Sequence, residues 1–427
     1  MLIQNATFPD GTIRDVRITG SQIAEVGEEL AVDHSGGSID ATGLRLLPGA
    51  IDVHVHFREP GYSHKETWAS GTKSAAAGGV TTVVDQPNTN PPTVSGQAFD
   101  TKLALADSAH VDFGINGGVT SDWDPDSLFD RALFALGEVF LADSTGDLGI
   151  SSDLFAEAVE RAATASTPVT VHAEDARHFD DSLRERTDFS VWSEYRPAEA
   201  EIDAVETVID IVQDHETTVH IAHTSTPEAV DAATDAGLTC EVSPHHLFLS
   251  TDDYPALGTF GRMNPPLRDP SRQEALWERL VDGTVDMVAT DHAPHTLEEK
   301  DASIWDAPSG VPGVETMVPL LAAAAERGEI TYDRIAEVTA RRPAEVFSLP
   351  QKGQIAAGND ADLTLLDPTP KPIDADTLHT KCSWTPFDGF DGVFPIFTMV
   401  RGRIVFEDGR FGDPIGQNVR SASQDSS

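Results

Sequence analysis

The segment Ile51–Gly61 reads IDVHVHFREPG and places two histidines, His54 and His56, two residues apart in an apolar run. Side chains two apart on a β-strand point to the same face, so both imidazoles can reach one metal ion. An isolated pair of this kind is equally typical of ordinary histidines that line a barrel interior. The rest of the sequence has to decide between a metal site and packing.

Apolar segments that end in polar or charged residues alternate with helical stretches through the middle of the chain. Together with Ile51–His56, the expected strands are Val80–Asp85, Val111–Gly117, Val139–Leu141, Val169–His172, Val219–His223, Leu238–Ser243 and Val285–Asp291. This alternation predicts a parallel α/β domain, and eight such units predict a TIM (β/α)8 barrel. We expect the barrel to span residues 49–350.

Both ends of the chain carry short β segments. Residues 1–48 contain LIQNATF, TIRDVRIT and QIAEVG, and residues 351–411 contain DADLTLLD and FTMVRGRIVFEDG. Their alternating character predicts strands, and we expect the two ends to pair into one small β-sandwich domain. Residues 412–427 are polar and end in a Ser-rich stretch, so we expect a flexible tail.

Length and composition exclude several classes of protein. The chain has 427 residues, 39% of them hydrophobic, which is enough for a barrel core and a companion domain and excludes a small binding module. No apolar run approaches the ~20 residues that cross a bilayer, and the N-terminus lacks a signal core. We expect a soluble, cytoplasmic protein with no membrane partner. Cys240 and Cys382 lack CxxC spacing, which favours neither a disulfide framework nor a cysteine zinc site.

The charge balance is strongly acidic. The chain has 29 Lys and Arg against 71 Asp and Glu, a formal net charge of 29 − 71 = −42. Such a chain is a poor partner for nucleic acid. Concentrated salt shortens the screening length to ~3 Å at 1 M and so relieves the self-repulsion. A halophilic host therefore explains the composition.

Three further strand ends carry metal-ligating residues. His172 follows PVTV, His223 follows TVHIA, and Asp291 follows VDMVAT. The C-terminal ends of barrel strands form the rim where active sites lie, so these residues should converge with the histidine pair. Four histidines and one aspartate suit zinc or a similar ion, and two ions could share a hydroxide. This convergence favours a metal centre over packing.

A series of phrases occurs in chain order: LLPGAIDVHVHFREPG, DQPNTNPPT, VHAED, EVSPHHLFL, MNPPLR, ATDHAPH, GVPGVET, KGQIAAGNDADLTLLD and KCSWTPFDG. With these phrases the chain resembles the amidohydrolase superfamily, within it the cyclic amidases, and most closely the dihydroorotase family, over nearly its whole length. The resemblance implies reversible hydrolysis of the ring amide of dihydroorotate to carbamoyl aspartate, a step of pyrimidine biosynthesis. It also implies that His54, His56 and Asp291 bind one metal ion, and that His172 and His223 bind a second.

One part of the family pattern is absent. Many members bridge two metals with a carbamylated lysine in a segment like GxKxFxxxSTG, but the segment here, Leu136–Gly146, has Glu138 at that position, and no lysine occurs between Lys102 and Lys300. A carbamylated lysine bridge is therefore excluded, and a carboxylate can replace it. Glu138 holds the aligned position, while Asp143 resembles an aspartate that other members place nearby. We favour Glu138; if neither carboxylate reaches both ions, the site holds a single metal.

The small-molecule substrate is expected to meet four residues. Arg58 follows the histidine pair, and its planar guanidinium suits a carboxylate such as the one on dihydroorotate; a structural salt bridge is the alternative. By resemblance, Asn88 and His295 are further carboxylate contacts. Asn264 either hydrogen-bonds the ring amide edge or forms a turn before two prolines. Asp291 is expected to act as the general base towards a metal-bound hydroxide and then as the acid towards the leaving nitrogen.

Weaker signals leave alternatives open. Loop 308–313 either presents backbone groups to the ring or is a simple connection. His245 and His246 either support the site or pack. His220 differs in strand parity from His223, so we expect a structural role, and we expect Trp192 to pack a helix against the barrel.

Two other functions compete with this reading. One is a different cyclic amidase, such as a dihydropyrimidinase, hydantoinase or allantoinase, against which Arg58 and Asn88 argue. The other is a catalytically inactive dihydroorotase-like subunit, which would be expected to lose metal ligands that this chain retains. A homo-oligomer is the common arrangement of soluble enzymes, but the sequence carries no interface signature.

Overall fold

The computed structural model describes residues 1–32, 37–142 and 148–421. Within these residues, eight parallel strands follow one another around a barrel: β6 (Ala50–Val55), β7 (Val80–Asp85), β8 (Asp112–Ile115), β9 (Leu136–Ala142), β11 (Val169–Glu174), β12 (Val219–Ile221), β13 (Thr239–Val242) and β14 (Met287–Val288). They pair in two arcs, β6 to β8 and β9 to β14. Parallel bridges from Gly117 to Leu136 and from Val55 to His292 join the arcs, which confirms the predicted TIM barrel.

The barrel strands are buried on both faces, as parallel strands covered by helices must be. Every residue of β6, β7 and β11 is buried. Val55, Val80, Val83 and the apolar residues of β11 pack with the surrounding helices in one large core. Ile51, Val53 and Val84 pack in a second cluster with Phe134, Met287 and Phe347. The strand ends are thereby held rigidly, which is what a site built from their side chains requires.

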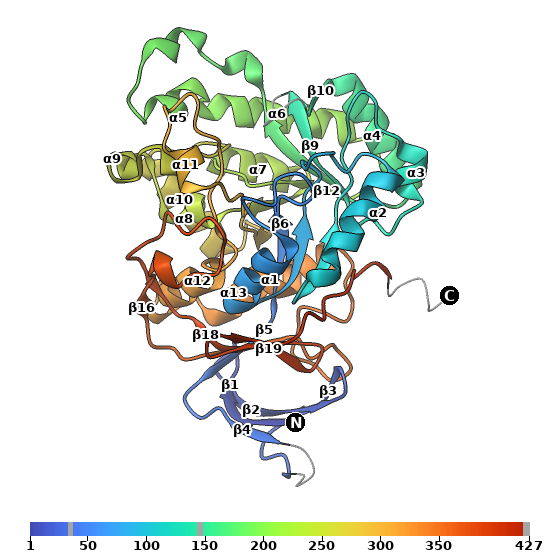
Figure 1. Cartoon of the computed structure of the whole chain (residues 1–427), viewed down its shortest axis with the longest axis vertical. Helices are drawn as coiled ribbons and strands as arrows, with labels where there is room; N and C mark the ends of the chain where they lie inside the picture. Colours follow the sequence, from blue (N-terminus) through green and yellow to red (C-terminus); the bar gives the residue numbers. More distant parts are fainter. Residues whose placement is uncertain (33–36, 143–147, 422–427) are drawn as a thin grey trace.

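Helices return the chain between the strands and cover the barrel (Figure 1). Those between strands are α1 (Trp68–Ala77), α2 (Gly96–Leu105), α3 (Pro125–Phe129), α4 (Ser152–Thr164), α5 (Val191–Tyr195), α6 (Ala198–Val212), α7 (Pro227–Asp235), α8 (Pro244–Phe248), α9 (Tyr254–Leu257) and α10 (Pro270–Asp282); α11 (Leu297–Lys300), α12 (Met317–Glu326), α13 (Tyr332–Ala336) and α14 (Arg342–Val346) follow β14. α4 is representative: Ser151 caps its first turn, and its buried residues, Phe155, Ala158, Val159 and Ala162, form one face. Among helices of the described residues, none combines the length and apolar character needed to span a membrane.

Strands from both chain ends form a second sheet below the barrel in the view of Figure 1. Its strands are β1 (Leu2–Thr7), β2 (Ile13–Thr19), β3 (Gln22–Gly27), β4 (Ser38–Asp40), β5 (Arg45–Pro48), β15 (Leu363–Leu366), β18 (Pro395–Val400), β19 (Arg403–Glu407) and β20 (Arg410–Phe411). β5 and β15 pair antiparallel and connect the two halves. Ile3 and Val16 from the first half pack with Leu363 and Phe397 from the second in one core.

Two expectations for the C-terminal part of the chain are corrected. Residues 371–392, expected in the β domain, form a separate pair, β16 (Lys371–Pro372) with β17 (Asp391–Gly392). Their segment packs on the barrel, because Trp384 and its apolar neighbours join a core that includes Met263.

The expected tail is also ordered as far as Ser421. The amide of Phe113 donates to Gln417, and the amide of Val419 donates to Phe113, so the chain extends alongside β8. Asn418 is buried there. A polar segment can dock in this way because its backbone groups find partners on the barrel. Residues 422–427 lie outside the described part of the chain.

Candidate functional site

Six of the predicted metal-ligating residues come together at the C-terminal mouth of the barrel. They are His54 on β6, His56 just after it, Glu138 on β9, His172 on β11, His223 after β12 and Asp291 after β14, and all six are buried. Asp143, the alternative bridging residue, lies outside the described residues. The expected convergence of strand ends is therefore present in the structure.

Three residues at this mouth have left-handed backbone conformations. The φ angles are 67° for Arg58, 35° for His223 and 46° for Asp291. The sequence placed His223 and Asp291 on strands, but β12 ends at Ile221 and β14 at Val288. Positive φ is uncommon outside glycine and costs on the order of 1–3 kcal/mol, and such strain concentrates at functional sites.

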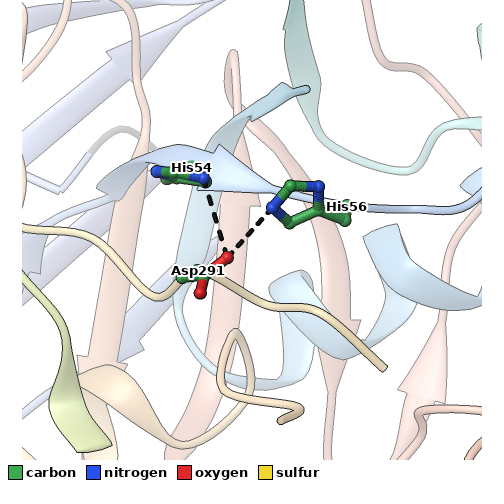
Figure 2. A group of neighbouring side chains, drawn as sticks. All are labelled: His54, His56 and Asp291. Carbon is green, nitrogen blue, oxygen red and sulfur yellow. Dashed lines mark hydrogen bonds and ion pairs between the residues drawn. The ribbon is translucent and has the colours of Figure 1, made fainter. Parts of the chain in front are cut away.

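His54, His56 and Asp291 form one group of neighbouring side chains (Figure 2). Asp291 Oδ1 lies 2.9 Å from His56 Nε2 and 3.6 Å from His54 Nε2. The three side chains therefore direct their ligand atoms towards one another.

Glu138 lies between this group and the other two histidines. Its Oε1 is 2.7 Å from His223 Nε2 and 3.0 Å from His172 Nδ1. Its Oε2 is 3.4 Å from His54 Nε2 and 4.0 Å from His56 Nε2. One carboxylate thus approaches all four histidines, as a bridging group must.

Acceptors hold the opposite nitrogens of three of these histidines. Glu241 Oε1 lies 2.7 Å from His54 Nδ1, and Asn88 Oδ1 lies 2.6 Å from His56 Nδ1. Glu174 Oε2 lies 3.2 Å from His172 Nε2. Contacts of this kind fix the tautomer and orientation of metal-binding imidazoles.

The two carboxylates at the centre of the site are anionic. Burial raises the pKa of Glu138, but the charge of His54 and the hydrogen bonds with His172 and His223 outweigh it and hold that pKa well below its usual value. Burial likewise raises the pKa of Asp291, and the His56 hydrogen bond together with the charges of the nearby histidines lowers it below its usual value. Buried anions of this kind need cations beside them.

The arrangement fits a metal centre. His54 Nε2 is buried and has no hydrogen-bond partner among the described residues, although two carboxylates face it. The ligand atoms of His54, His56 and Asp291 all lie within 4.8 Å of one another, and so do those of His54, Glu138 and His223. Imidazole nitrogens with carboxylate oxygens are the donor set of zinc and related ions.

A cavity opens beside this cluster and brings together three of the four expected substrate residues. Arg58, Asn88 and Asn264 line it together with the ligand side chains, Ser309 and Gly310. Loop 308–313, whose role the sequence left open, therefore reaches the cavity. His295 lies behind Arg58, with its Nε2 3.2 Å from Arg58 Nη2 and 2.9 Å from the carbonyl of Ser309.

Arg58 is buried, and no carboxylate lies within ion-pair distance of it in the described part of the chain. Its Nε donates to the Pro294 carbonyl at 3.3 Å. Burial lowers the pKa of Arg58 from its usual value, but arginine keeps its charge in proteins. The alternative of a structural salt bridge therefore finds no partner among the described residues, and the guanidinium lines the cavity without a paired carboxylate there.

Several residues contribute more than the sequence indicated. Glu241 was not singled out, although a carboxylate within the buried strand TCEV was a usable signal. His220, expected to be structural, holds Glu241 at 3.1 Å from its Nε2. Trp192, expected only to pack, also donates from Nε1 to Asn264 Oδ1 at 3.2 Å.

His245 and His246 are both buried outside the ligand cluster. His246 Nε2 contacts the Pro265 carbonyl at 3.0 Å, and the two rings pack 4.3 Å apart. Burial lowers the pKa of His245 to about 4, so its ring is neutral at pH 7.

Comparison with known proteins extends these observations. A model of the amidohydrolase family matches residues 45–405. The dihydroorotase of Halobacterium salinarum is 59% identical over 98% of this chain and 99% of that protein. The dihydroorotase of Methanosarcina acetivorans is 43% identical over 92% of this chain and 88% of that protein. Among solved structures, an L-hydantoinase (dihydropyrimidinase) from Arthrobacter aurescens matches with a TM-score of 0.93 at 27% identity, over 98% of each chain.

Proposed function

The chain belongs to the amidohydrolase family, and we propose that its active site opens and closes the ring amide of dihydroorotate. It is a metal-dependent hydrolase of cyclic amides, a dihydroorotase that interconverts dihydroorotate and carbamoyl aspartate. The single observation that carries the substrate assignment is the buried Arg58, which faces the ligand cluster without a carboxylate partner among the described residues.

We further propose that the site holds two zinc ions. His54, His56 and Asp291 would bind one ion, His172 and His223 the other, and Glu138 would bridge them. The short contacts of both Glu138 oxygens support this assignment. When bound, such ions lower the pKa of a water molecule to ~7 and polarise the amide carbonyl.

Asp291 is suited to move the proton. It lies at the cavity wall, beside His56, as an anionic carboxylate. In ring opening it would accept a proton from the attacking water and deliver it to the departing ring nitrogen. In ring closure the same carboxylate would take the proton from the nitrogen as that atom attacks the carboxyl carbon, and it would deliver the proton to the departing oxygen, which leaves as water.

The remaining polar groups would fix the ring. Arg58 would pair with the ring carboxylate through two parallel N–H···O bonds. Asn88 lines the same cavity. Its Oδ1 faces His56 Nδ1, and its NH2 group, which makes no hydrogen bond within the described residues, would donate to the substrate. A neutral ring amide without a carboxylate would leave the Arg58 charge unpaired, which disfavours such substrates.

A substrate panel tests the proposal. The purified protein in high-salt buffer would be supplied with dihydroorotate, dihydrouracil, hydantoin and allantoin, with metal content measured on the same sample. We expect selective turnover of dihydroorotate and about two zinc ions per chain. Preference for another ring would refute the substrate assignment, and no turnover by metal-replete protein would indicate an inactive subunit.

A further inference from the structure

The side-chain amide of Asn264 is fixed in one orientation. Its Oδ1 accepts hydrogen bonds from Trp192 Nε1 at 3.2 Å and from Ser309 Oγ at 3.1 Å. An indole N–H can only donate, so the atom that faces Trp192 has to be the amide oxygen. The NH2 group of Asn264 therefore points away from Trp192, and it makes no hydrogen bond within the described residues.

Trp192 is itself held firmly. It is 4% exposed and packs in a cluster with Tyr195 and Ile304. The Arg262 guanidinium lies 3.9 Å from the centre of its ring, and its Nε1 also donates to the Met263 carbonyl at 3.0 Å. The single indole N–H is shared between the Met263 carbonyl and Asn264 Oδ1, and its fixed position favours the amide oxygen of Asn264, not its NH2 group, on that side.

The cavity wall therefore presents hydrogen-bond donors beside the metal ligands. Asn264 lines the cavity together with Arg58 and Asn88. The oxygens of both asparagines are already occupied, that of Asn88 by His56 Nδ1. A ligand seated here meets N–H groups, so it has to offer oxygen acceptors at these positions.

We propose that Trp192 is a positioning residue that turns Asn264 into a hydrogen-bond donor to a carbonyl oxygen of the substrate ring. This inference rests on the proposed function and adds to it the polarity of one recognition contact. Trp192 does not touch the substrate; it acts through Asn264 alone. The contact selects rings with an oxygen acceptor at that edge and rejects rings that present an N–H there.

A double-mutant cycle tests this role. Trp192→Phe keeps an aromatic ring of smaller size and removes the N–H donor, while Asn264→Ala removes the group on which that donor acts. We expect Trp192→Phe to lower kcat/KM for dihydroorotate about twofold to tenfold, the range for one hydrogen bond, and to change it less than about twofold when Asn264 is already alanine. An equal loss in both backgrounds would reduce Trp192 to a packing residue.

A second comparison tests the donor itself. Asn264→Asp would keep the Trp192 contact but present an anionic oxygen to the ring, so we expect a lower kcat/KM than for Asn264→Ala. A rate equal to or above that of the alanine variant would overturn the donor assignment. Ser309→Ala is the matched control. The Ser309 hydroxyl also contacts Asn264, but it can donate or accept and so does not fix the orientation of the amide. We therefore expect Ser309→Ala to lower kcat/KM less than Trp192→Phe does.

Metal content and melting temperature, measured on every variant, separate folding defects from loss of the contact. If the wild-type protein hydrolyses a different ring amide, the proposed substrate is wrong. The same cycle run with that substrate then still decides the role of Trp192.

Discussion

Replacing Arg58 with methionine should remove recognition of the substrate carboxylate while keeping most of the side-chain volume. A guanidinium has five N–H donors. In the structure Nε is used by the Pro294 carbonyl. His295 Nε2 lies 3.2 Å from Nη2 but faces the Ser309 carbonyl as a donor, because the Lys65 ammonium faces its Nδ1. Within the described residues the Nη donors are therefore left for a bidentate carboxylate pair.

The size of the effect follows from those donors. A hydrogen bond to a charged group contributes about 1.5–3 kcal/mol, so two contribute about 3–6 kcal/mol. At 1.4 kcal/mol for each factor of ten, kcat/KM for dihydroorotate should fall roughly 10²- to 10⁴-fold. Arg58→Lys keeps the charge and loses the planar fork, so its loss should be intermediate.

The assay compares two substrates on the same proteins. Dihydrouracil has the same ring without the carboxylate, so its slow hydrolysis should be nearly unchanged in Arg58→Met. Metal content serves as the control for the ligand cluster. An equal loss for both substrates would mean that Arg58 supports the site as a whole, and no loss for dihydroorotate would refute the reasoning.

Three further predictions concern the metal bridge, the buried histidine and the charge. Glu138→Ala should lose about half of the bound metal, and its kcat should fall more than about 100-fold, while Asp143→Ala should keep both ions. If Glu138→Ala bound as much metal as the wild type, the bridging role would move to Asp143. His245 has a folded pKa of about 4 against a usual 6.5, so the unfolded chain binds the extra proton between these values, and stability falls as the pH falls through this window. At pH 4.5 the loss in the free energy of unfolding is on the order of 2–3 kcal/mol. Urea unfolding at a series of pH values should therefore show a smaller loss of stability in acid for His245→Gln than for the wild type. Identical pH profiles of the two proteins would contradict this. The net charge of −42 should make the melting temperature rise from dilute buffer to molar KCl, where the screening length falls to ~3 Å, and full structure and activity after dialysis into dilute buffer would show that salt is not required.

The sequence was most informative where metal-ligating residues stand at positions of a strand whose side-chain direction can be predicted. His54 and His56 share a face because they are two residues apart at the end of β6, and this spacing predicted that both imidazoles would point the same way. His172 was expected at the mouth because it follows an apolar strand segment. These positions follow from local geometry, so no partner residue had to be known.

Residues that act through distant partners could not be found in this way. Glu241 contacts His54 across 187 positions of the chain, and Trp192 contacts Asn264 across 72. No local pattern encodes such pairs, because the closure of the barrel creates them. The left-handed conformations of His223 and Asp291 were also missed, since apolar periodicity continues past the end of the hydrogen-bonded strand.

The C-terminal segment was misjudged for a related reason. A polar, Ser-rich stretch has the composition of a tail, yet Gln417 and Val419 pair with Phe113. Backbone hydrogen bonds depend little on the side chains, so composition gave no indication of this docking.

The pairing of β5 with β15 has a consequence for synthesis on the ribosome. Residue 48 ends β5 and residue 363 begins β15, so 363 − 48 = 315 positions separate the two strands. At about 5–20 residues per second, the first half of the β domain waits roughly 15 to 60 seconds for β15, the first strand of the second half. During that time β5 exposes an open edge, which is a site of association with other nascent chains. The barrel can begin to assemble in this interval, so the β domain is the last part of the molecule to close.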